Sequence, residues 1–106
     1  MVGDYVQLKG KVTGVQEQKV ILEGTSGKVT GIRKVVLTSS ATCNVRLQDT
    51  ADSPKSLTAI HELVAGVPLE LKWTGVSAPK TNAGKGITLT NSAGNVAFDI
   101  EYWLEP

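Results

Sequence analysis

The regular alternation of apolar and polar residues is the feature of this sequence that most restricts its fold. It is clearest near the C-terminus, where one phase holds five large apolar residues: Val96, Phe98, Ile100, Tyr102 and Leu104. Side chains of a β-strand point to opposite faces in turn, so a period of two indicates a strand with one buried face. The 13 Val, 5 Ile and 11 Thr make 29 β-branched residues of 106, which favours strands along the whole chain.

The alternating segments and the turn residues between them predict eight strands. These are expected near residues 3–9, 18–23, 28–38, 42–49, 56–64, 67–73, 85–90 and 95–104. The segments between them are rich in Gly, Asn, Asp and Ser, which favour turns. Segment 56–64 also fits a short helix that begins at Pro54 or Ser56. We favour a strand there, because Ala65-Gly66 is typical of a tight hairpin into the next strand.

Eight short strands in a chain of this length predict a β-sandwich, because each sheet must bury its apolar face against another. The 106 residues suffice for one domain of ordinary size. We therefore expect an all-β, single-domain sandwich of about eight antiparallel strands over residues 16–106. Residues 1–15 contain three glycines and fit the core pattern least, so we expect them to form an N-terminal arm.

Composition and charge exclude several classes of function. Eleven basic and 10 acidic residues give a net charge of +1. Proteins that bind nucleic acids or membrane surfaces need clustered basic charge instead. No apolar run approaches the roughly 20 residues that span a bilayer, and no signal peptide is expected from the first residues. One Cys and one His are too few for a zinc site built from these residues. We expect no cofactor, no metal, no nucleic acid and no membrane partner, and Cys43 shares an apolar phase that predicts a buried thiol.

Two short motifs suggest chemistry, but each has a simpler interpretation. Segment Ala83–Thr88 contains Gly-Lys, as phosphate-binding loops do. Such a loop needs Ser or Thr after the lysine, and Gly86 follows Lys85 instead, so a turn into a strand is the better interpretation. His61 and Glu62 are neighbours on an expected strand, so their side chains point to opposite faces and cannot act together as acid and base.

The segment after the strand near 42–49 is rich in oxygen ligands. These are Gln48, Asp49, Thr50, Asp52 and Ser53. Their spacing is not that of an EF-hand, which needs ligands at alternating positions and a Glu at the twelfth. A solvated turn is the simpler interpretation, and an irregular calcium loop stays open as the alternative.

The two tryptophans fall in different phases of their strands. Trp73 continues an apolar phase, so we expect it in the core. Trp103 shares the polar phase of Asp99 and Glu101. An out-of-phase tryptophan near a chain end is often covered by a terminal arm, a partner subunit or a ligand. We predict contact with an arm or a partner, with a sugar-binding platform as the alternative.

The order of the segments, taken together, resembles that of a known group of proteins. The segments that carry the resemblance are Gly27–Ser40, Cys43–Asp49, Leu57–Ile60, Ala65–Leu71, Lys85–Thr90 and Val96–Tyr102. Over residues 20–104 they resemble the small β-sandwich, often jelly-roll, structural proteins of tailed bacteriophages. Members of this group are capsid decoration (cement) proteins, tail parts or fibre-associated domains. Members of this group have no catalytic residues, so the resemblance assigns no catalytic role to any residue of this chain.

The resemblance implies a non-enzymatic virion protein that is made in the host cytoplasm and decorates the capsid exterior. It would be a homo-oligomer, a trimer, that clamps the major capsid protein or another virion protein. We expect partner contacts at Tyr5, Gln7 and Lys9 of the arm and at Trp103. The alternative is a ligand- or carbohydrate-binding module of a tail or fibre, which needs free aromatic side chains. An enzyme is the third hypothesis, and the sequence offers no paired catalytic motif for it.

Overall fold

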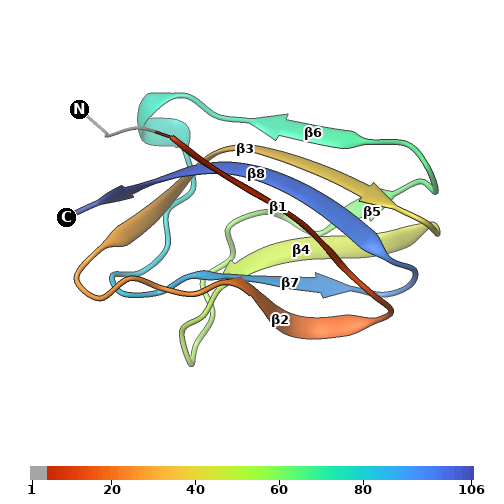
Figure 1. Cartoon of the computed structure of the whole chain (residues 1–106), viewed down its shortest axis with the longest axis horizontal. Helices are drawn as coiled ribbons and strands as arrows, with labels where there is room; N and C mark the ends of the chain where they lie inside the picture. Colours follow the sequence, from red (N-terminus) through yellow and green to blue (C-terminus); the bar gives the residue numbers. More distant parts are fainter. Residues whose placement is uncertain (1–4) are drawn as a thin grey trace.

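The computed structural model describes residues 5–106, which form two packed β-sheets of four strands each (Figure 1). The strands are β1 (Val6–Val12), β2 (Gln16–Leu22), β3 (Val29–Ser39), β4 (Cys43–Asp49), β5 (His61–Leu63), β6 (Leu69–Lys72), β7 (Ile87–Asn91) and β8 (Val96–Glu105). A single turn of 3-10 helix, η1 (Gly75–Ser77), lies between β6 and β7. The predicted all-β, single-domain sandwich is confirmed.

The strand order is that of a jelly roll. Sheet A has the order β1-β8-β3-β6, sheet B has the order β2-β7-β4-β5, and all neighbouring strands are antiparallel. Only β4 and β5 follow each other within one sheet, so every other connection crosses between the sheets, as Figure 1 shows. Two four-stranded sheets joined in this way form the eight-stranded jelly roll.

The core lies between the sheets and is built from the inward phase of the strands. Ten aliphatic side chains are almost completely buried: Ile32, Val35, Leu37, Val45, Leu47, Leu63, Ile87, Leu89, Val96 and Ile100. Burying each side chain of this size stabilises the fold by about 1.5–3 kcal/mol. Cys43 is buried among them, as predicted, and Trp73 packs partly buried at the margin of the core.

The arm predicted over residues 1–15 is a strand of the domain itself where the structure describes it. Residues Val6–Val12 pair with β8 along their whole length, and Val12 is buried opposite Val96. Gly10, one of the three glycines that set this segment apart from the core pattern, lies over the Phe98 ring, where a Cβ would be 2.7 Å from Cζ. The arm prediction is therefore wrong for β1, because its glycine makes room for a core ring. Residues 1–4 of the predicted arm lie outside the described residues.

Segment 56–64 was predicted as one strand and is mostly irregular. Only His61–Leu63 forms a strand, which pairs with β4. Before it, the N–H groups of Leu57 and Thr58 donate to the carbonyl oxygen of Leu47, at 2.9 and 3.2 Å. The Thr58 hydroxyl oxygen in turn accepts the Leu47 N–H at 3.0 Å. These bonds hold the segment against β4 without a regular ladder, which is why neither the strand nor the alternative helix forms at its start.

Each of the four edge strands carries a feature that opposes pairing with another chain. Strands β5 and β6 contain only three and four residues. Strand β2 has two register irregularities and contains Gln18 at a positive φ of 50°. Strand β1 exposes Lys9 and Lys11. Short length, bulges and edge lysines are the usual means by which sheets avoid edge-to-edge association.

The entry to β7 gives a direct test of this packing. A Cβ at Gly86 would lie 1.8 Å from the carbonyl oxygen of Leu22, a backbone atom that no rotamer change can move. We expect Gly86→Ala to lower the free energy of unfolding by at least about 3 kcal/mol, measured by urea denaturation. Gly10→Ala is the control, with an expected loss of about 1 kcal/mol because the Phe98 ring can tilt away. Equal losses in the two variants would contradict this account of the β2–β7 contact.

Candidate functional site

Trp103 lies on the outer face of sheet A, yet only 4% of its surface is exposed. Its strand partner is Gly31 of β3, and a Cβ at Gly31 would lie 2.2 Å from the indole Cζ2. The missing side chain lets the indole lie directly on the β3 backbone. The phase of Trp103 was therefore predicted correctly, and its burial depends on the glycine opposite it.

Tyr5, the residue just before β1, covers the other side of this indole. The two ring centroids are 6.1 Å apart at an interplanar angle of 78°, an edge-to-face pair. The Arg33 guanidinium lies 4.9 Å from the Tyr5 ring centroid and forms an ion pair with Glu101. The predicted contact of Trp103 with the N-terminal segment is thus present, and it is made within one chain.

The edge of the indole is fixed by a carboxylate. Trp103 Nε1 donates to Glu105 Oε2 at 3.0 Å, and Lys80 Nζ lies 2.9 Å from Glu105 Oε1. The indole hydrogen bond, followed by the bond from Lys80, holds the pKa of Glu105 below its ordinary value. With its N–H engaged and its rings covered, Trp103 is not available as a platform for a sugar.

The other predicted interface residues lie beside Tyr5 on the same face. Gln7 and Lys9 are exposed on β1, opposite Glu101 and Asp99 of β8. Lys9 Nζ is 3.9 Å from Asp99 Oδ2. The structure therefore brings Tyr5, Gln7 and Lys9 together as an exposed row, with Trp103 buried at one end of it.

The outer face of sheet A pairs its charges within the chain. Among residues 5–106, all five ion pairs lie on this face or its margin: Lys9–Asp99, Arg33–Glu101, Lys34–Glu70, Lys72–Glu70 and Lys80–Glu105. Cross-strand pairs of opposite charge stabilise a sheet modestly, by about 0.2–1 kcal/mol each. Lys11 of β1 is the exception, an exposed cation on this face that forms no ion pair within residues 5–106. The acids named here are all paired, so the face has a small excess of basic charge and no free anion among them.

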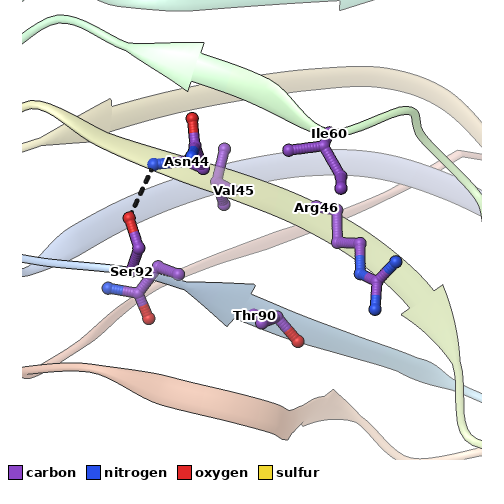
Figure 2. A pocket seen from close by; sticks show the side chains of 7 residues that line it. Asn44, Val45, Arg46, Ile60, Thr90 and Ser92 are labelled. Atoms are coloured by element: carbon purple, nitrogen blue, oxygen red, sulfur yellow. Dashed lines mark hydrogen bonds between the residues drawn. The ribbon is translucent and has the colours of Figure 1, made fainter.

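The outer face of sheet B is different, because it contains a shallow hollow with one unpaired cation. The sheet B hollow has a volume of about 270 Å³ and is lined by Asn44, Val45, Arg46, Ile60, Thr90, Asn91 and Ser92. Figure 2 shows Ile60 beside Arg46, with Thr90 on the neighbouring strand β7 and Ser92 just after that strand ends. Within residues 5–106 no carboxylate lies within 4.0 Å of the Arg46 guanidinium.

The polar groups of the sheet B hollow are arranged as hydrogen-bond donors. The Ser92 hydroxyl oxygen accepts the Asn44 N–H at 2.8 Å, drawn as a dashed line in Figure 2. The Thr90 hydroxyl oxygen accepts the Gln18 N–H at 2.9 Å. Each hydroxyl therefore keeps its own hydrogen for donation, and the guanidinium of Arg46 can only donate. Together they suit a ligand group rich in acceptors, such as a carboxylate.

Sequence reasoning did not find this hollow. Its residues come from β4, β7 and the segment before β5, and only the pairing register places Arg46 beside Thr90. The one signal in the sequence was Ile60, a large aliphatic residue that the structure leaves 63% exposed.

Asp49 closes the end of β4 by accepting hydrogen bonds from two loops. Its Oδ1 accepts the N–H groups of Ala51 and Lys55 at 3.1 and 3.0 Å, and its Oδ2 accepts the backbone and side-chain N–H of Asn82 at 3.0 and 2.9 Å. Burial raises the pKa of Asp49, but these four hydrogen bonds outweigh it and leave the pKa below its ordinary value. Because N–H donors occupy both oxygens, this carboxylate is committed to the loops rather than to a cation.

The remaining motifs have structural roles. Gly84 adopts a positive φ of 78° in the turn that leads into β7, so segment 83–88 is a strand entry and not the start of a helix. His61 and Glu62 lie opposite Val45 and Asn44 on β4, so their side chains belong to different phases. Nothing in this arrangement brings an acid and a base together.

Comparison with protein-family models, curated proteins and solved structures finds no match for this chain. Within the described part of the chain, no three His, Cys, Asp or Glu side chains are grouped so that they would hold a metal ion. No helix among residues 5–106 is long and apolar enough to cross a membrane.

The hydrogen bonds of Asp49 predict a definite pH dependence of stability. Folding lowers the pKa of the Asp49 carboxyl. Its contribution to the free energy of unfolding is therefore complete at pH values above the pKa of the unfolded chain, about 3.9, and is lost as the pH falls through the lower pKa of the folded state. We expect Asp49→Asn to lose about 2–3 kcal/mol of unfolding free energy at neutral pH, because an amide replaces an ionised acceptor. Below about pH 4 it should then lose less further stability than the wild type.

The matched control is Asp52→Asn, an exposed aspartate of the same loop. Urea denaturation at successive pH values should show that this variant keeps the acid sensitivity of the wild type. Identical pH profiles for Asp49→Asn and the wild type would show that Asp49 is not the group responsible.

The cover over Trp103 predicts a spectroscopic change. In a Trp73→Phe background, Tyr5→Ala should shift the Trp103 emission to longer wavelength, because the indole becomes accessible to water. The lost aromatic pair should also cost about 1 kcal/mol of unfolding free energy. Gln7→Ala, two residues along the same exposed row, should leave the emission unchanged. An unshifted emission in Tyr5→Ala would mean that other groups cover the indole.

Proposed function

We propose that this chain is a non-enzymatic structural protein of a virus particle, of the capsid decoration type. In this role it sits on the capsid exterior as a homo-oligomer and stabilises the head by binding neighbouring subunits of the major capsid protein. The observation that carries the proposal is the jelly-roll strand order of the two sheets. Viral capsid proteins are among the main users of this fold. Because fold alone does not decide function, the use of the side chains matters equally.

The reactive side chains support a mechanical role. Both carboxylate oxygens of Asp49, which the sequence offered as a calcium ligand, accept hydrogen bonds that hold two loops together. The one thiol, Cys43, is buried in the core. Trp103, the best candidate for a sugar platform, is covered by Tyr5 and bonded to Glu105. This last point counts against the carbohydrate-binding alternative.

The edges of the sheets bear on how such a protein would attach. An arm that adds a strand to a neighbour needs a free segment and an open edge, but β1 is paired within its own sheet. The other edge strands are short or irregular. Attachment through the sheet faces and loops therefore fits this molecule better than strand exchange. Symmetry then repeats each weak contact over the particle surface.

The proposal is tested by asking whether the protein is a component of particles. Virus particles from cultures that carry the gene are purified by density gradient and analysed by quantitative mass spectrometry. We expect peptides of this chain to co-sediment with intact particles in a fixed ratio to the major capsid protein. A mild wash that releases the chain while the capsid stays intact would place it on the exterior.

The matched comparison is the soluble fraction of the same lysate. If the chain occurs only there, while the major capsid protein sediments with particles, the proposed function is wrong. Presence in purified tails or fibres, without enrichment on heads, would favour the module of a tail or fibre instead.

A further inference from the structure

The outer face of sheet B contains a second unpaired charge close to Arg46. Glu62 of β5 lies opposite Asn44 of β4, and Arg46 is two residues further along β4. Positions related in this diagonal way are about 7–8 Å apart between backbones. Glu62 is exposed, and within residues 5–106 it forms no ion pair. One cation and one anion therefore lie side by side on this face without binding each other.

Exposed aliphatic side chains flank this acid. Ile60 and Val64 lie two residues before and two residues after Glu62, just outside the two ends of β5, and are 63% and 53% exposed. Large aliphatic side chains grouped on one face, with charged residues beside them, are typical of a surface that another protein covers. On the outer face of sheet A, by contrast, the acids of β8 are ion-paired within the chain and the exposed Tyr5 ring packs against Trp103.

We propose that the outer face of sheet B binds the same face of a second copy of this chain about a two-fold axis. Glu62 of each copy enters the sheet B hollow of the other and binds Arg46 there. The Ser92 and Thr90 hydroxyls, whose oxygens already accept backbone N–H groups, donate hydrogen bonds to the carboxylate oxygens of Glu62. A two-fold axis makes both contacts at once, since a surface that contains a donor and its acceptor side by side is complementary to itself.

A second copy of the chain provides partners for more of the groups on this face than a purely acidic protein surface does. An acidic surface would neutralise Arg46 but would place like charge against Glu62, which is unfavourable. A second copy pairs both charges and brings the aliphatic residues of the two β5 segments together. The contact is reciprocal, so it joins copies in pairs. It is compatible with a trimer only as a link between one trimer and the next.

The test uses two charge-reversing variants, Arg46→Glu and Glu62→Arg, and light scattering over about a hundredfold range of concentration. The wild type should reach twice the chain mass. Each single variant should be monomeric, with a dissociation constant raised at least about tenfold, because both contacts of its symmetric dimer become like-charge pairs. An equal mixture of the two variants should restore the dimer, since one face is then wholly acidic and the other wholly basic.

The matched control is Lys11→Glu, which makes the same change of charge at an exposed position on sheet A. It should dimerise like the wild type. Circular dichroism and thermal unfolding should show that all variants keep the fold. Restoration by mixing is the decisive result, because neither misfolding nor a general change in charge would produce it.

Three results would overturn the proposal. They are a strictly monomeric wild type, an oligomer that neither variant changes, and two monomeric variants that fail to associate when mixed. The last result would show that association needs both Arg46 and Glu62 but that the two do not bind each other across the interface. This test does not use virus particles, so it can fail while the virion role holds, and it can succeed if the chain is absent from particles.

Discussion

The bulge at Arg33 sets the phase of sheet A. Ile32 pairs with Tyr102 and Lys34 pairs with Glu101, so one residue of β3 has no partner on β8. The extra residue allows Ile32 and Val35 both to point inward although they are three positions apart. Without it, either the first or the second half of β3 would turn its apolar residues outward.

The same bulge organises the outer face. It brings Arg33 to Glu101 and to the Tyr5 ring, and it leaves Gly31 beneath Trp103. Strand β8 lies between β3 and β1, so a register error on one side would also displace β1 from the other. The cover over Trp103 therefore depends on the β3–β8 register.

Sequence reasoning recovered the local part of this structure and missed the part that depends on register. The alternation near the C-terminus predicted β8, because its inward residues are regularly spaced and half-buried strands show that period. The phase of Trp103 followed from the same pattern. Its cover did not, because Tyr5 and Gly31 meet it only after β8 has paired on both sides. The glycines of residues 1–15 suggested that this segment lies outside the core, whereas Gly10 makes room for the Phe98 ring.

The sheet B hollow shows the same limit more strongly. In the sequence, Asn44 and Arg46 lie in the polar phase of one alternating segment, and Thr90 lies in the polar phase of another. That Arg46 lies beside Thr90, and Glu62 diagonally from Arg46, is a property of the β5-β4-β7 register. No single segment carries that information. Candidate sites made of one residue from each of several strands are thus the hardest to predict in a sandwich.

The two outer faces divide the molecule into a self-contained side and an open side. On sheet A, each acid of β8 has a basic partner in the chain, and the exposed aromatic ring covers another ring. On sheet B, the charges and aliphatic side chains have no such partners among the described residues. Since the edges oppose strand addition, association in an assembly is left to a face, and the physical chemistry favours sheet B. A rigid domain that binds through one face, and exposes another on which most charges are paired within the chain, is suited to coating a surface without aggregating on it.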